Sequence, residues 1–102
     1  MGVRLNEDKE WLLTPTLTPT SVSANSTSEQ TFTVTGVVTS DFVEINKPTH
    51  TSGIVVGNVR VSAANTIAVT FQNCTGSPIT PPSEKYQLVV QRYEKTYLTV
   101  PA

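Results

Sequence analysis

Apolar and polar residues alternate in short runs along most of the chain after Pro19. Between Gln30 and Gly36, Phe32 and Val34 fall on one face of an extended segment, and threonines fall on the other. Strict alternation over a short run is typical of a β-strand with one buried and one solvated face. The same pattern predicts further strands at residues 20–24, 40–48, 54–63, 66–73 and 85–93, with 95–102 as a last strand or a tail.

These runs indicate an all-β fold. Residues typical of turns, mostly Gly, Asn, Pro and Ser, separate the strands at intervals of roughly eight to twelve residues, a spacing typical of antiparallel sandwiches. None of the runs is the continuous apolar stretch of a strand that is buried on both faces. We therefore expect an antiparallel two-sheet, immunoglobulin-like β-sandwich of about seven strands, where "immunoglobulin-like" describes architecture alone.

The alternation also predicts which side chains close the core. Phe42 falls on the outward face of its strand, where it would cover an edge. Tyr86 lies near the start of the penultimate strand, where it either bonds back to the backbone as a tyrosine corner or packs as an ordinary core tyrosine. The residues expected to point inward are Phe32, Val34, Val43, Ile45, Val59, Val61, Ile67, Val69, Phe71, Tyr86, Leu88 and Val90.

The two ends of the chain depart from this pattern. Thr14-Pro15 and Thr18-Pro19 disfavour a helix, because proline lacks an amide hydrogen and biases its predecessor toward extended conformations. A single helical turn after Asn6 is an alternative, and it would need docking to be stable. We divide the chain into an N-terminal arm (1–19), a β-sandwich domain (20–92) and a C-terminal strand or tail (93–102).

Large apolar residues in both ends predict that these ends bind something. Disordered tails are usually poor in such residues, and aromatic side chains often anchor protein contacts. Extended segments add to the sheet edge of a partner through main-chain hydrogen bonds, or they cover the edges of their own domain. The candidate partner-binding residues are Trp11, Leu12, Leu13, Tyr93, Tyr97 and Leu98.

The charge and composition of the chain argue against nucleic-acid and membrane partners. Only 15% of the residues are charged, the formal net charge is −1, and the basic residues are scattered along the chain. Nucleic-acid binding normally needs a basic patch that neutralises phosphates, so we expect no nucleic-acid partner. No stretch resembles a secretory signal or a membrane span, so we expect no membrane partner. The single Cys74 fits folding in a reducing cytosol.

The reactive side chains form no recognisable catalytic set. His50 is the only histidine, and no carboxylate lies within five residues of it. Asp41 and Glu44 are three positions apart on a predicted strand, so they point to opposite faces and form no dyad. Cys74 is expected to be a buried or half-buried small apolar side chain. Because no metal-ligand cluster is present in the sequence, we expect neither an enzyme nor a cofactor or metal site.

Four stretches of the core resemble a small virion protein of tailed bacteriophages. They are EQTFTVTGV at 29–37, VEINKP at 43–48, GIVVGNVRVSAANTIAVTFQNCTG at 53–76 and PPSEKYQLVVQR at 81–92. The resemblance spans about Pro19 to Arg92 and includes neither the arm nor the tail. It transfers no binding residue, because the matching positions are those expected to form the sandwich.

The resemblance implies a capsid decoration, or cement, protein. Such a protein would be made in the host cytoplasm, bind the major capsid protein on the outside of the virion, and act as a homotrimer or homodimer around a symmetry axis. Extended arms that lie on another chain would favour this function. The alternative is a tail or fibre domain, or a module that recognises host-surface carbohydrate, and a row of exposed aromatic side chains would favour it.

Overall fold

The computed structural model describes residues 9–93, which form eight β-strands and contain no helix. The strands are β1 (Lys9–Leu13), β2 (Thr16–Leu17), β3 (Ser26–Thr33), β4 (Phe42–Asn46), β5 (Ile54–Ala63), β6 (Thr66–Asn73), β7 (Glu84–Lys85) and β8 (Gln87–Arg92). Every strand pair within residues 9–93 is antiparallel. The prediction of an antiparallel all-β fold is confirmed.

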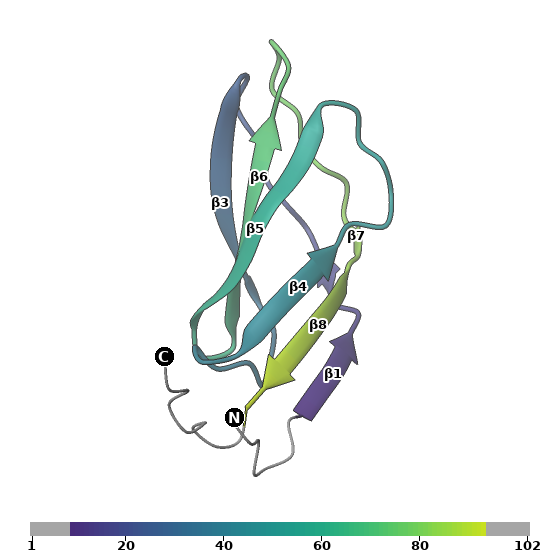
Figure 1. The fold of residues 1–102 in the computed structure, drawn as a ribbon. Coiled ribbons are helices and arrows are strands. Elements are labelled where there is room, and N and C mark those ends of the chain that lie inside the picture. Colours follow the sequence, from purple (N-terminus) through teal and green to yellow (C-terminus); the bar gives the residue numbers. More distant parts are fainter. Residues whose placement is uncertain (1–8, 94–102) are drawn as a thin grey trace, which may run out of the picture.

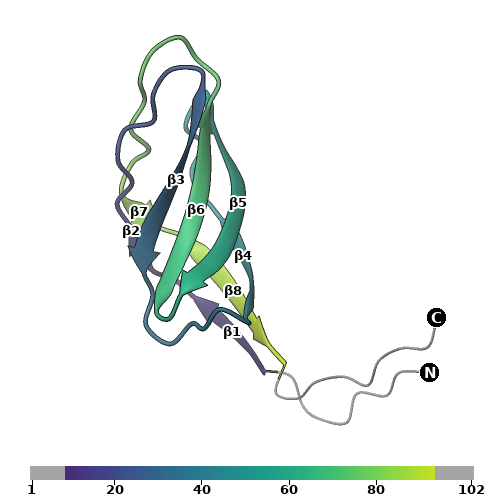
Figure 2. The same ribbon diagram turned by 90° about the vertical axis from the view of Figure 1, so that its left-hand side faces the viewer.

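Two three-stranded sheets make up most of the domain. One has the order β3-β6-β5, and the other has the order β1-β8-β4; a short two-stranded ladder joins β2 to β7. In both views β3, β6 and β5 lie side by side, while β1, β8 and β4 form a separate group (Figure 1, Figure 2). The two sheets are therefore the two layers of a sandwich.

Both sheets contribute to a single hydrophobic core. Phe71, Ile67 and Val69 on β6 are 0% exposed, and Leu88 on β8 is equally buried. Complete burial of one such side chain contributes about 1.5–3 kcal/mol. The inward set predicted from the alternation is confirmed, because its members belong to the core cluster or pack against it.

Residues 9–17 of the predicted arm pair with their own domain. Lys9 lies opposite Arg92 and Leu13 opposite Leu88, and the same register continues after a break with Thr16 opposite Lys85. The break falls at Pro15, whose carbonyl accepts a hydrogen bond of 2.9 Å from the Tyr86 amide. Because proline has no amide hydrogen to donate, it interrupts the ladder without changing its register. Residues 9–13 are thus the edge strand of the β1-β8-β4 sheet, and residues 16–17 belong to the β2-β7 ladder. The helical turn considered for the arm is absent from residues 9–13.

One turn lies earlier than the sequence pattern indicated. The alternation predicts one strand at 20–24 and the next from Gln30, which leaves residues 25–29 as a turn, but β3 already begins at Ser26. Ala24 and Asn25 make the turn, and Asn25 has a φ of 51°, a left-handed conformation that Asn tolerates better than most residues. The preceding run contributes only an isolated bridge between Val22 and Ile79.

Candidate interaction surfaces

The outward face of the β1-β8-β4 sheet carries exposed apolar side chains. Leu12 on β1 is 63% exposed and lies opposite Val89 on β8, which is half-buried. Phe42 on β4 is 50% exposed and lies opposite Gln91, diagonally across from Val89. Residues at such diagonal positions are within reach of aromatic side chains. We call Leu12, Phe42 and Val89 the apolar strip.

Arg92, at the end of β8, organises the neighbouring end of the domain. Its guanidinium donates two hydrogen bonds of 2.7 Å to the Asp41 carboxylate and one of 2.9 Å to the Gly36 carbonyl. It also lies 5.0 Å from the ring centroid of Trp11, a cation–π distance. The hydrogen bonds from Arg92 hold the pKa of Asp41 below its usual value despite burial of the carboxylate. Arg92 therefore fixes Trp11 and the loop before β4 in one arrangement.

A mostly apolar hollow adjoins this cluster. Its volume is about 350 Å³, and its walls include Trp11, Leu13, Val37, Val90 and Arg92. Trp11 and Leu13 face the same side of the sheet as Val90 and Leu88, since they lie opposite these residues in the ladder. Trp11 therefore points away from the apolar strip, toward the side of the sheet that faces the core.

The structure describes four of the six predicted partner-binding residues. Trp11, Leu12 and Leu13 occupy β1, where Leu12 faces outward and the other two face the sandwich. Tyr93 directly follows β8 and is 50% exposed. Tyr97 and Leu98 lie outside the described residues.

Three exposed aromatic side chains lie near one end of the β1-β8-β4 sheet. Lys9 and Arg92 are opposite one another, so β1 begins where β8 ends, and β4 begins beside Gln91. This arrangement gathers Trp11, Phe42 and Tyr93 near the same end of the domain. Sequence reasoning named the large side chains, but it missed Arg92 and Val89, because their roles depend on strand pairing that brings distant segments together.

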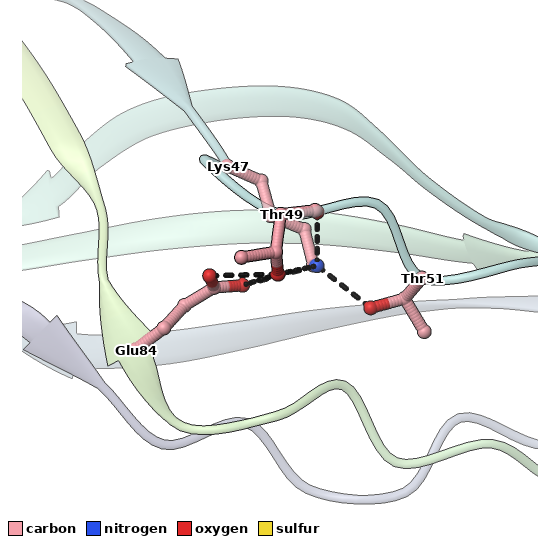
Figure 3. A network of polar contacts seen from close by, with 4 residues as sticks. All are labelled: Lys47, Thr49, Thr51 and Glu84. Carbon is pink, nitrogen blue, oxygen red and sulfur yellow. Dashed lines mark hydrogen bonds and ion pairs between the residues drawn. The ribbon is translucent and has the colours of Figure 1, made fainter.

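A second polar cluster lies where β4 leads into the next loop (Figure 3). Lys47 and Glu84 form an ion pair of 3.0 Å, with side chains that are only 8% and 12% exposed. Lys47 Nζ also donates to Thr51 Oγ1 and to the Thr49 carbonyl, each at 2.7 Å. Burial raises the pKa of Glu84, but the hydrogen bonds from Lys47 and from the Thr49 hydroxyl outweigh it, so the pKa lies below its usual value. The cluster connects β4 to β7 and has a structural role.

Tyr86 is fully buried, and its hydroxyl has no hydrogen-bond partner among the described residues. It therefore packs as a core tyrosine and makes no tyrosine-corner bond. Burial, with a smaller contribution from the Glu84 carboxylate, raises the pKa of Tyr86 to about 12.

The reactive residues singled out in the sequence lie apart. Asp41 binds Arg92, whereas Glu44 is exposed on the outward face of β4. His50 lies on the wall of a shallow hollow together with Lys47, Pro48 and Thr51. Cys74 is exposed, so the prediction that it is buried or half-buried is wrong. It follows the last residue of β6, where the chain leaves the sheet.

Residues 9–93 contain neither a metal-binding cluster nor a membrane-spanning helix. No group of three or more His, Cys, Asp or Glu side chains lies close enough together to hold a metal ion in this part of the chain. The same residues contain no helix of the length and apolarity that a membrane crossing requires.

Comparisons of the chain with protein-family models, with curated proteins and with solved structures found no match.

Proposed function

We propose that this chain is a virion structural protein of a tailed bacteriophage, a capsid decoration protein that binds the lattice of the major capsid protein and stabilises the head. The resemblance of residues 19–92 to small phage virion proteins suggests the class. The observation that carries the proposal is the apolar strip of Leu12, Phe42 and Val89 on the outward face of the β1-β8-β4 sheet.

A decoration protein needs a surface that leaves the fold stable while it is exposed and whose burial on binding lowers the free energy. The strip meets this requirement, because its side chains lie on a paired sheet and still expose large apolar groups. Burial of apolar area contributes about 25 cal/mol per Å². Many identical copies on one shell make modest contacts effective through avidity.

The alternative, a carbohydrate-recognition module, receives less support from the structure. Sugar-binding sandwiches usually present aromatic rings on one common surface. Here Trp11 and Phe42 fall on opposite faces of the β1-β8-β4 sheet, since Trp11 lies opposite the buried Val90 and Phe42 lies opposite Gln91. We therefore favour a docking surface for protein.

The test is binding of the purified protein to heads of the encoding phage that lack it. Leu12→Asp places a charge on the apolar strip and should weaken binding at least roughly tenfold, because a charge must be desolvated on docking. Val55→Asp is the matched control, since Val55 is also exposed, at 48%, but lies on β5 of the other sheet.

Thermal unfolding of both variants shows whether either change disturbs the fold. Trp11→Ala tests the neighbouring hollow and should cost about 2 kcal/mol of docking energy if Trp11 is an anchor. Equal binding of the wild type and Leu12→Asp would contradict the proposed surface. Failure of the wild type to bind heads at all would contradict the decoration function.

A further inference from the structure

The sandwich has an open seam along one side. Strand β4 pairs only with β8, and β5 pairs only with β6, among the described strands. The facing edges of β4 and β5 bound a groove of about 590 Å³, and Figure 1 shows the two strands next to one another. Each edge strand presents a row of main-chain donors and acceptors that can pair with an added strand.

The core is least well covered along this seam. Six apolar residues pack against the core while remaining partly exposed, and four of them, Ile45, Ile54, Val56 and Val59, belong to β4 or β5. The groove is lined by Ile45, Val56 and Val59 on its inner side and by Glu44 and Arg60 at its rim. An extended segment with one apolar face and one polar face would cover the first group and leave the second in water.

A segment of this kind exists at the C-terminal end of the sequence. Residues 96–100 read Thr-Tyr-Leu-Thr-Val, so that Leu98 and Val100 share one face of an extended strand. Pro101 follows and would end such a strand. The nine residues after Tyr93 can span about 30 Å when extended, and a five-residue partner such as β4 needs roughly 17 Å.

The geometry favours a segment from another molecule over the chain's own. Strand β8, from which the C-terminal segment leaves, lies on the far side of β4 from the seam. Arg92 at its end is held by Asp41 and by the Gly36 carbonyl, and Asp41 directly precedes β4. The chain's own segment would have to pass around this clamped loop, whereas a segment from a neighbouring copy can enter the groove directly.

We propose that the seam between β4 and β5 binds residues 96–100 of a second copy of this chain, with Leu98 and Val100 facing the core and main-chain hydrogen bonds joining the added strand to the free edge of β4. The resemblance implies a homotrimer or homodimer, and this proposal adds the segment and the surface that join the copies. The association requires only copies of this chain, so it stands or fails independently of binding to capsids.

The experiment compares the full-length chain with Leu98→Asp and with Thr99→Asp. The two variants add the same charge at adjacent positions, on opposite faces of the segment, and neither changes a residue of the eight strands. In analytical ultracentrifugation the wild type should self-associate, Leu98→Asp should weaken the association at least roughly tenfold, and Thr99→Asp should stay close to the wild type.

Hydrogen exchange identifies the surface involved. Amide protection in β4 and β5 should rise with protein concentration in the wild type and in Thr99→Asp, and should not rise in Leu98→Asp. A wild type that remains monomeric at its highest soluble concentration would overturn the proposal. So would equal effects of the two variants, or seam protection that depends on Leu98 but not on concentration, because the chain would then fill its own groove.

Discussion

The outward faces of the two sheets differ, although their inward faces share one core. On the β3-β6-β5 sheet, Arg60 on β5 and Glu29 on β3 form a bidentate ion pair across the central strand β6. The Arg60 guanidinium donates two hydrogen bonds of 2.9 Å to the Glu29 carboxylate. Ala68 is 0% exposed although it lies on this outward face, between Arg60 and Thr31 in the strand register. On the β1-β8-β4 sheet the corresponding positions carry Leu12, Val89 and Phe42, and nothing in the described chain covers Leu12 and Phe42 to a comparable extent.

In the proposed function, the core residues fold the domain and the apolar outward face binds a partner. A polar outward face needs no partner and contributes to solubility, as the threonines of β3 illustrate. An apolar outward face gives no folding energy while it remains in water, and we propose that its role is contact with another molecule. Substitutions test this comparison. Those in the core common to both sheets should have the largest effect on stability, and those on a single outward face should have the smallest.

The largest expected effect comes from the shared core. Phe71→Ala on β6 should lower the free energy of unfolding by about 3–5 kcal/mol, and Leu88→Ala on β8 should lower it by about 2–5 kcal/mol. Each change removes a fully buried side chain. Urea denaturation followed by fluorescence and by circular dichroism should give one coincident transition for each variant. Two separate transitions would show that the sheets unfold independently and would refute a single core.

The ion pair between Lys47 and Glu84, which is largely buried, should contribute more to stability than the exposed pair between Arg60 and Glu29. Lys47→Met leaves the Glu84 carboxylate, only 12% exposed, without its cation, and should lower the free energy of unfolding by about 2–3 kcal/mol. Arg60→Met is the matched control, since its ion pair with Glu29 lies on the outward face with side chains 54% and 39% exposed. Salt screens such exposed pairs, so the control should show the smaller loss in urea denaturation. A greater loss for Arg60→Met would reverse this ranking.

Removal of the unpaired hydroxyl should stabilise the domain. Tyr86→Phe keeps the ring in the core and deletes a buried group that has no hydrogen-bond partner, so the free energy of unfolding at pH 7 should rise by about 1 kcal/mol. A loss of stability in this variant would show that the hydroxyl has a partner.

The same variant has a signature at high pH. The folded-state pKa of Tyr86, about 12, lies above the ordinary value of 10.0, so the folded state holds this proton more tightly. The stability that follows from this difference is fully present below pH 10 and is lost as the pH rises from 10 to about 12. The midpoint temperature of thermal unfolding should therefore fall more steeply across that pH range in the wild type than in Tyr86→Phe.

Alternation alone was enough to predict the strands that form the core. The runs at 54–63 and 66–73 match β5 and β6 residue for residue, because their apolar positions repeat with the period of a strand and a two-residue turn separates them. The inward positions of β4 and β8 were predicted for the same reason. The start of β3 was missed, since its first four residues are polar and its inward positions there carry serines.

The features of the candidate surfaces could not be predicted in this way. The docking of residues 9–17 depends on pairing with residues more than sixty positions later, and the sequence allowed both a free arm and an edge strand. The contacts of Arg92 with Trp11 and Asp41 join three separate segments. No local pattern encodes such contacts, because they arise only when the strand order brings the segments together.

The smallest expected effect on stability gives the most direct test of the two outward faces. Phe42→Thr and Val55→Thr each replace an outward apolar side chain, 50% and 48% exposed respectively, with a residue that suits a strand. Both should change the free energy of unfolding by no more than about 0.5 kcal/mol. Phe42, however, lies diagonally across from Val89 on the apolar strip, whereas Val55 lies opposite Gln72. Retention in hydrophobic interaction chromatography should therefore fall more for Phe42→Thr, and equal falls would mean that the strip does not act as one surface.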